Sequence, residues 1–437
     1  MLITAISNLN HTFANLFVHD LNRTVELVRD DRKGNAACYE DLLELKKATW
    51  FDKVTGYSEA AAMVSNKYGV GAADIKVVMT DPEYSSIYKI DMLNGNFLDS
   101  RAMDRGESHA VVSGKLALKL FKTLDVIGNE IELYGKKFTV TGVYKDKGST
   151  LWDMLGDGFD RIYIPYGSAD GFVEKPVDVI SLLIKAELDM AVTKRFLENE
   201  LGSSLFSYKI IEYPVSGPAF HQFYDLLIFF LGALAALFTL LFMVRFTLDI
   251  RSYLKKKAET FYFKEIIKTD FKSLIRYLMI VLFCGIVMVI LLKFIQFRFV
   301  VADKYVPFDN IFDLKFYLNA FLGDIKAVNS NTSDVYSIVK LNYDHMAGLN
   351  IICTFIAAIL MVAAIAFFNI LLVSDATFLK VLRYLLIPAV AGGALGIILS
   401  IFAGFGVVIP VSAWVVIIYY FIICDANKKL SVNSVNL

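Results

Sequence analysis

The sequence has few of the residues that metal centres, disulfide frameworks and hydrolytic sites require. It contains only four cysteines, and none is closely spaced with another, so neither a disulfide framework nor a cysteine metal site is indicated. The five histidines are scattered, which favours surface or loop positions over a metal site. No GxSxG, HExxH or paired-carboxylate pattern stands out. We therefore expect no catalytic residue, no cofactor and no metal.

A nucleotide-binding loop is also missing. The nearest match, Gly106 followed by Gly114-Lys115-Leu116, has the wrong glycine spacing, and leucine replaces the Ser or Thr that would hold Mg²⁺. Around Asp157, the sequence Gly-Asp-Gly is interpreted as a turn rather than a calcium site. The net charge is zero, so charge says little about partners, and we expect no nucleic-acid partner.

Apolar residues are in excess, at 56% of the chain, and they are unevenly spread. Residues 1–222 resemble ordinary soluble sequence, whereas 223–424 hold nearly all the long apolar runs. A bilayer core needs about 20 mostly apolar residues in a helix. Five segments meet this need, of which the last two are separated only by a glycine-rich turn and could instead form one hairpin that does not fully cross. The five predicted spans are 223–244, 278–297, 349–373, 384–402 and 403–423.

Basic residues in short loops predict which side of the membrane each loop faces. The segment 245–276 has nine basic and four acidic residues, whereas the loop 301–348 has four lysines and six aspartates. We therefore expect 245–276 and the tail 425–437 to be cytoplasmic, and 301–348 to be external. Residues 1–222 must then form an external domain. The first 23 residues make a poor signal peptide, so either an upstream anchor helix is missing from this sequence, which we favour, or this weak segment is its remnant.

The external part alternates between strand and helix patterns without a strict repeat, which predicts an α+β domain. Its clearest feature is the stretch Val126–Asp146, where apolar and polar residues alternate on both sides of Tyr134-Gly135. This pattern predicts a β-hairpin with Ile131, Phe138 and Val140 buried. Val143 is out of step with that alternation, so it joins the same core only if Gly142 marks a bulge.

An ordered set of motifs in residues 92–166 resembles the extracytoplasmic domain of MacB/FtsX-type ABC transporter permeases. The motifs are LNGNFLD at Leu93–Asp99, AVVSGKLALKLF at Ala110–Phe121, DVIGNEIELYGKKFTVTGVYKD at Asp125–Asp146 and IYIP at Ile162–Pro165. The resemblance implies a MacB-like periplasmic core and an α-helical membrane domain in the inner membrane of a bacterium. It also implies structural rather than chemical roles for its pattern residues, which are Gly95, Phe97, Phe121, Gly128, Gly135, Phe138, Gly142, Val143 and Pro165.

In such permeases, a cytoplasmic segment after the external domain docks the ATPase. Here this segment contains apolar residues at helical spacing with lysines along one flank, which predicts a basic amphipathic helix. Such a helix can contact an ATPase, rest on anionic lipid, or do both. The family's usual glycine is replaced by Thr269-Asp270. The candidate coupling residues are Phe263, Lys264, Ile266, Ile267, Lys268 and Phe271.

The resemblance implies a permease subunit of an ABC-type exporter or mechanotransmission complex, which does not itself hydrolyse ATP. Its implied partners are a separate cytoplasmic ATPase and a periplasmic partner or a peptide- or lipoprotein-like substrate. A homodimer or second permease is a further option, although Gly392 and Gly396 favour helix packing within the chain. The alternative hypothesis is a membrane-anchored sensor or scaffold that has lost transport. Co-purification of an ATPase would separate the two.

Overall fold

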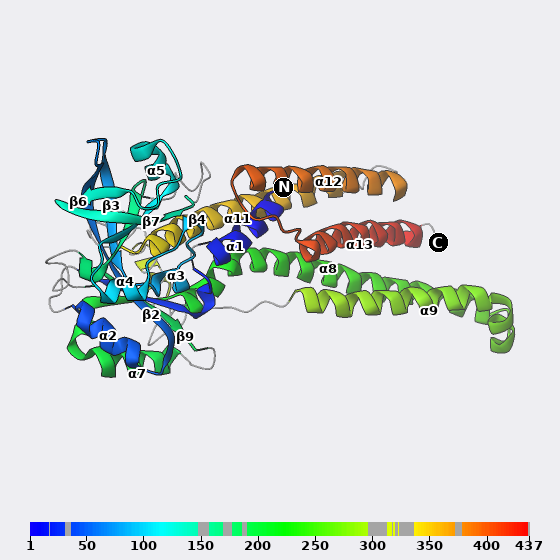
Figure 1. Cartoon of the computed structure of the whole chain (residues 1–437). Coiled ribbons are helices and arrows are strands. Elements are labelled where there is room, and N and C mark those ends of the chain that lie inside the picture. Colours follow the sequence, from blue (N-terminus) through cyan, green and yellow to red (C-terminus); the bar gives the residue numbers. More distant parts are fainter. Residues whose placement is uncertain are drawn as a thin grey trace. The chain divides into compact units, whose positions relative to one another are not determined.

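The computed structural model divides the chain into two compact units (Figure 1). The sheet unit comprises His11–Phe220 and Val300–Gly348, and the helical unit comprises Met1–Asn10, His221–Phe299 and Leu349–Leu437. The division thus differs from the sequence-based boundary after residue 222, because the first ten residues group with the helices and 300–348 groups with the sheet. The described residues are 1–16, 18–30, 36–146, 157–168, 177–185, 190–295, 313–316, 318–319, 322, 336–371 and 378–435.

The described part of the sheet unit is built on one mixed sheet of ten strands, ordered β10-β1-β9-β2-β3-β8-β5-β7-β4, with β6 pairing with β2 and β7. The pairs β3–β8 and β5–β7 are parallel, and the others are antiparallel. The strands are β1 (Thr24–Arg29), β2 (Phe51–Asn66), β3 (Gly71–Thr80), β4 (Met92–Gly95), β5 (His109–Ser113), β6 (Glu130–Leu133), β7 (Lys136–Tyr144), β8 (Asp160–Pro165), β9 (Val179–Ile184) and β10 (Tyr208–Glu212).

Short helices complete the sheet unit, which confirms the α+β domain predicted from the sequence. Three α-helices supply two or three buried residues each to the main apolar core: α2 (Tyr39–Lys47), α5 (Gly114–Phe121) and α7 (Met190–Leu201). The hydroxyl of Ser113 accepts from the backbone N–H of Leu116 and caps the start of α5. The remaining helices are α3 (Tyr84–Ile87), α4 (Ser100–Asp104), η1 (Leu21–Arg23), η2 (Tyr166–Ser168) and η3 (Gly202–Ser207).

Alternation along the strands gives the sheet two different faces, because successive side chains point to opposite sides. On β1, Val25 and Leu27 join the apolar core, so Glu26 between them points to the other face. Similarly, Lys76 lies between core residues of β3, and Tyr163 between core residues of β8. The second face therefore carries charged and aromatic side chains, and we call it the polar–aromatic face.

The stretch Val126–Asp146 forms the predicted hairpin. Strands β6 and β7 are antiparallel, and Tyr134 and Gly135 both have positive φ at the turn between them. Ile131, Phe138 and Val140 are buried in the apolar core. The predicted bulge is also present, because Ala110 pairs with Val140 whereas Val111 pairs with Gly142, so that one residue of β7 is skipped. That irregularity returns Val143 to the core.

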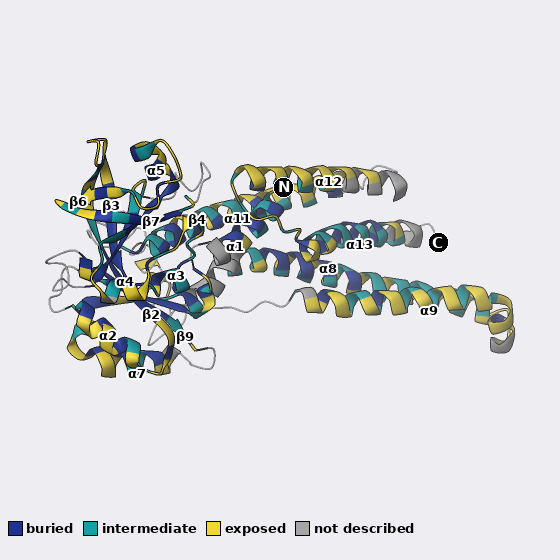
Figure 2. Ribbon diagram, in the orientation of Figure 1, coloured by how far each residue is buried: buried dark blue, intermediate teal, exposed yellow. Residues whose placement is uncertain are grey.

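The helical unit contains α9 (Phe263–Phe294), α12 (Phe378–Phe402) and α13 (Val411–Val435), and three other helices belong to it in part: α1 (Leu2–Leu16), α8 (Tyr213–Ala258) and α11 (Ile338–Leu371). Among the described residues, four helical segments are long and apolar enough to cross a bilayer: Tyr224–Ala258, Glu265–Lys293, Ile338–Phe368 and Val411–Leu430. Ile387–Phe402 is a shorter apolar segment. Many apolar residues of α9 and α12 are exposed, and Figure 2 shows exposed positions along both helices. Such surfaces suit contact with lipid.

The last predicted span differs clearly from the helix bounds. The segment 403–423 was predicted to be one span, but α12 ends at Phe402 and α13 begins only at Val411. Between them, Gly404 has a positive φ and Pro410 directly precedes the new helix. The chain therefore turns over several residues before the last apolar helix starts.

Within the helical unit, α1 packs closely against α12. A Cβ atom added at Gly396 would lie 2.6 Å from the carbonyl oxygen of Met1, so only glycine permits this approach. The amide of Asn8 donates to Ser400 Oγ at 2.9 Å and accepts from the backbone N–H of Val408 at 2.7 Å. These contacts agree with the interpretation of the glycine motif as packing within the chain.

Candidate functional site

The turn between α8 and α9 is the first candidate, because it contains the predicted coupling residues. Helix α8 ends at Ala258 and α9 starts at Phe263. Tyr262 caps α9: its backbone N–H donates to the carboxylate of Glu265, three residues into the helix. The two helices therefore form an ordered hairpin around a short turn, which we call the coupling hairpin (residues 253–271).

Asp270 interrupts α9 and fixes the shape of the coupling hairpin. Its backbone angles are non-helical, with φ −111° and ψ 18°, so α9 bends at this point. The Asp270 carboxylate accepts from the Tyr253 hydroxyl at 3.0 Å and forms an ion pair with Lys257. Both partners come from the last turns of α8. Contacts across the hairpin therefore hold the bend at Asp270.

The hairpin presents an apolar, aromatic surface around its turn. Tyr262 is 83% exposed and Phe271 is 56% exposed, and Phe261 and Ile267 are exposed as well. Ile266 differs, since it is only 3% exposed and so belongs to the inside of the fold. Lys268 is exposed beside them, whereas the side chains of Phe263 and Lys264 lie outside the described part. Of the predicted coupling residues, Ile267, Lys268 and Phe271 are therefore exposed. Phe261 and Tyr262, which were not predicted, are exposed as well.

A buried acid on the polar–aromatic face is a second candidate, which sequence analysis did not identify. Glu26 is completely buried, and its carboxylate accepts hydrogen bonds from Tyr88 at 2.6 Å, Tyr213 at 2.8 Å and Ser337 at 2.6 Å. Burial raises the pKa of Glu26, against the lowering effect of the hydroxyl donors. Tyr213 is the first residue of α8, and Ser337 directly precedes α11. One carboxylate therefore ties the starts of two long helices to the sheet.

A network of charged side chains lies on the same face of the sheet and contacts Tyr336, the residue before Ser337. Arg161 pairs with Glu59 at 3.0 Å and with Asp157 at 2.6 Å, and Lys76 pairs with the same two acids at 3.0 and 3.1 Å. The hydroxyl of Tyr336 donates to Asp157 at 2.6 Å. Burial alone would raise the pKa of Asp157, but the hydrogen bonds and charge of Arg161, together with Tyr336 and Lys76, hold it well below its usual range.

Together, these contacts form a site within the sheet unit, which we call the junction because the first residue of α8 and the residues before α11 meet the sheet there; it is defined by Glu26, Asp157, Tyr213, Tyr336 and Ser337. The sequence offered one signal for it, namely a single acid inside the apolar strand TVELVR. Its partners could not be found in the same way, because they lie 62, 187 and 311 residues away in the chain. Asp157, interpreted from sequence as part of a turn, is the central acid of the charged network. No group of residues suited to a metal ion occurs among the described residues.

Of the family-pattern residues, the glycines allow turns and close backbone contacts. A Cβ atom at Gly95 would lie 2.2 Å from the carbonyl oxygen of Thr141, and one at Gly142 would lie 2.3 Å from that of Asn96. Two backbones thus pass in direct contact where β4 meets β7. Gly128 and Gly135 adopt positive φ, which glycine accepts without steric cost.

The other pattern residues pack in or against the two faces of the sheet. Phe138 and Val143 lie in the apolar core, and Phe121 packs against it from the end of α5. Phe97 joins the aromatic side chains of the other face, with its ring 5.4 Å from that of Tyr163. Pro165 ends β8. These positions are consistent with structural roles.

Comparison with known proteins finds a family model that matches the amino-terminal part. Residues 1–198 match the family described as MacB-like periplasmic core domain. The periplasmic region of MacB from Actinobacillus actinomycetemcomitans is similar at 14% identity and a TM-score of 0.38, over 44% of this chain and 89% of that one. The extracellular domain of the noncanonic ABC-type transporter YknZ from Gram-positive bacteria is similar at 18% identity and a TM-score of 0.36, over 43% of this chain and 99% of that one. No curated protein matches the chain.

Proposed function

We propose, from the MacB-like periplasmic core domain that residues 1–198 carry, that this chain is the non-catalytic permease subunit of an ABC-type system in a bacterial inner membrane. A separate cytoplasmic ATPase moves the membrane helices, and the sheet unit outside the membrane acts on a periplasmic partner or substrate. The observation that carries the proposal is the coupling hairpin: two apolar helices joined by an ordered turn that exposes aromatic and basic side chains.

The coupling hairpin has the properties of a protein-binding surface. Aromatic side chains contribute strongly to binding at interfaces, and Tyr262 and Phe271 are both more than half exposed. The Tyr253–Asp270 hydrogen bond and the Lys257–Asp270 ion pair fix the angle of the bend. A surface that is held in shape loses less conformational entropy on binding. A force applied to this hairpin would reach both α8 and α9.

The junction offers a route from the membrane helices to the sheet. Because α8 and α11 both begin at the Glu26 site, a shift of either helix along its axis would move Tyr213 or Ser337 relative to β1. The three hydroxyl groups donate directly to a completely buried carboxylate, so such a shift would break a buried hydrogen bond unless the sheet followed. In this proposal, the junction makes the sheet follow the helices.

The experiment is co-purification from the native membrane. We expect an ATPase to co-purify with the full-length chain in stoichiometric amount, and the Ile267→Asp variant to lose it. Ile267 is exposed, so the variant inserts and folds, but an unpaired charge buried in the contact costs several kcal/mol. Leu118→Asp, on an exposed leucine of α5 in the sheet unit, is the matched control and should retain the ATPase.

Two outcomes contradict the proposal in different ways. If no ATPase accompanies the wild-type chain, the sensor or scaffold hypothesis takes its place. If an ATPase co-purifies equally with the wild type and with Ile267→Asp, the coupling hairpin does not bind it. The exposed aromatic residues would then be assigned to the lipid surface, the other location considered from the sequence.

A further inference from the structure

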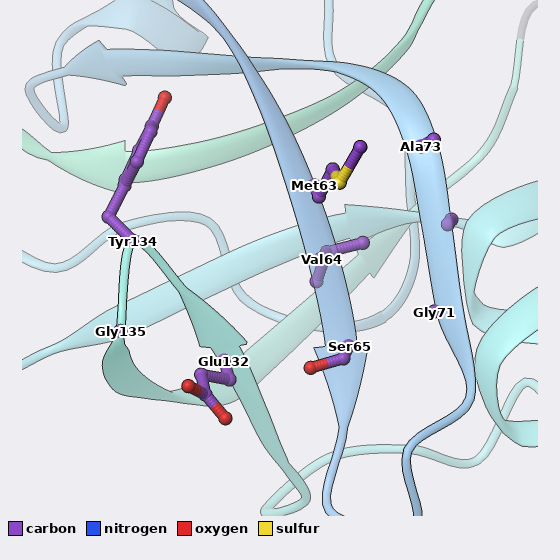
Figure 3. A pocket seen from close by; sticks show the side chains of 9 residues that line it. Met63, Val64, Ser65, Gly71, Ala73, Glu132, Tyr134 and Gly135 are labelled. Carbon is purple, nitrogen blue, oxygen red and sulfur yellow. The ribbon is translucent and has the colours of Figure 1, made fainter.

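A groove lies where the β2–β3 hairpin meets the turn between β6 and β7 (Figure 3). Its volume is about 520 Å³, which is in the range of small binding pockets. Met63–Ser65 of β2 lie between Glu132–Gly135 and the start of β3 at Gly71–Ala73. Met63 is 75% exposed and Tyr134 is nearly half exposed, whereas Val64 and Ala72 below them are buried. The groove is therefore an accessible apolar surface that lies over buried residues of β2 and β3.

The backbone at the groove carries a bulge and a strained residue. Ala62 pairs with Ile75 and Val64 with Ala72, so Met63 faces two residues of β3, Ala73 and Asp74. Asp74 has a φ of 58°, a conformation uncommon for a residue other than glycine. Bulges of this kind redirect side chains and are common beside functional sites. Met63 is exposed at this bulge, as is Ala61 two residues earlier, whereas Val64 next to it is buried.

The tip of the hairpin is held rigidly by Asn66. Its side-chain oxygen accepts from the backbone N–H groups of Tyr68 and Val70, at 2.9 and 3.0 Å, and its amide donates to the carbonyl of Leu120 at 2.7 Å. Asn66 thus joins the β2–β3 turn to the end of α5. The groove is pre-organised, which lowers the entropy cost of binding.

The charges at the groove have one sign. Glu132 is the only charged residue among those lining it, and Asp74 adjoins the lining. Within the described part of the chain, neither carboxylate forms an ion pair or a hydrogen bond. Glu130, on the same strand as Glu132, differs in pairing with Lys137 at 3.2 Å. The groove therefore combines apolar side chains with two carboxylates that form no ion pair within the described residues, although Lys137 lies opposite Glu132 in the β6–β7 register.

We propose that this groove binds a segment of a partner protein in which an apolar side chain stands next to lysine or arginine. The apolar side chain packs between Met63 and Tyr134, and the cation pairs with Glu132, with Asp74 adding to the attraction. Met and aromatic residues are typical of binding surfaces, and opposite charges favour the correct partner over acidic ones. The inference rests on the proposed function in one respect, since it identifies the surface through which the external unit meets its partner.

The test uses the full-length chain in phosphatidylcholine nanodiscs and a fluorescein-labelled peptide, Gly-Lys-Leu-Lys-Phe-Gly, followed by fluorescence polarisation. We expect binding that weakens by about tenfold in Glu132→Lys and by several-fold in Met63→Ser. The peptide Gly-Glu-Leu-Glu-Phe-Gly should bind the Glu132→Lys variant better than the wild type. Matched controls on other exposed residues of the sheet unit, Glu44→Lys in α2 and Leu118→Ser in α5, should bind the basic peptide like the wild type.

The inference is overturned if both groove variants bind the basic peptide with wild-type affinity, or if the wild type does not prefer it to the acidic one. It is also overturned if empty nanodiscs account for all the binding. Its failure can be separated from failure of the proposed function. Glu132→Lys should still co-purify with the ATPase, and Ile267→Asp should still bind the peptide. If the chain binds the peptide through Glu132 but no ATPase co-purifies with it, the groove proposal is supported and the permease proposal is contradicted.

Discussion

Phe138 illustrates how a single residue links the sequence pattern to stability. It is 1% exposed, among the core residues of β7. Phe138→Ala should lower the free energy of unfolding of the sheet unit by about 3–5 kcal/mol, because it removes buried apolar area and leaves a cavity. Urea titration with pulse proteolysis of the full-length chain in nanodiscs measures this loss. Phe206→Ala is the control, since Phe206 is 77% exposed and its removal should change little. Equal effects of the two substitutions would contradict a core role for Phe138.

Residue patterns predicted the apolar core better than the polar site. The alternation of apolar and polar residues alone predicted that Ile131, Phe138 and Val140 are buried, because burial on one face of a strand depends on the local period. The same alternation could not predict the hydrogen bonds of Glu26, because its hydroxyl donors come from distant segments. A local pattern can show that an acid lies inside an apolar strand, but not what it meets there.

At the scale of elements, the start of α11 should respond to pH through Asp157. Because the pKa of Asp157 is held below its usual value of about 3.9, the ionised form stabilises the fold above that value, and this contribution is lost as the pH falls below it. Acidification should therefore release Tyr336 and lower the protection of the amide groups at the start of α11. Hydrogen exchange with mass spectrometry, expressed as protection factors, measures the effect.

Asp157→Asn is the control for that prediction, because it removes the titrating group and should remove the acid-dependent loss. Glu26 works in the opposite direction: its pKa is raised, so its stabilising effect is complete at low pH and is lost as the pH rises through the raised value. Glu26→Gln should remove that second dependence. Protection that does not change on acidification of the wild type would contradict the assignment of Asp157 to the α11 contact.

Element predictions succeeded where the period was strong and the segment short. The hairpin predicted at Val126–Asp146 appears as β6–β7. The 16-residue strand β2 was missed. Its burial does not alternate strictly, since it pairs with three strands in turn and is irregular in two of these pairings. Propensity cannot anticipate such a pattern, because tertiary pairing creates it.

At the scale of the whole molecule, hydropathy found the apolar helices but not their ends. The first predicted span, 223–244, lies inside a helix that runs from Tyr213 to Ala258. Hydropathy measures only the part that lipid would surround, whereas the structure continues α8 into the Glu26 site at one end and the coupling hairpin at the other. These polar extensions of α8 belong to the two candidate sites. Hydropathy therefore failed to predict the parts of the helix on which the proposed function depends.

The side of the membrane on which each unit lies is the last prediction. If basic loops face the cytoplasm, residues 1–222 and 301–348 are outside and 245–276 is inside. In a chain whose four native cysteines are replaced by serine or alanine, a membrane-impermeant maleimide should label Glu44→Cys in intact cells but label Lys256→Cys only after lysis. Glu44 is an exposed residue of α2, and Lys256 is an exposed residue near the end of α8. Ser330→Cys, whose position lies outside the described residues, should label like Glu44→Cys. The reverse pattern would put the sheet unit in the cytoplasm, where neither a periplasmic partner nor an ATPase on the coupling hairpin could be reached as proposed.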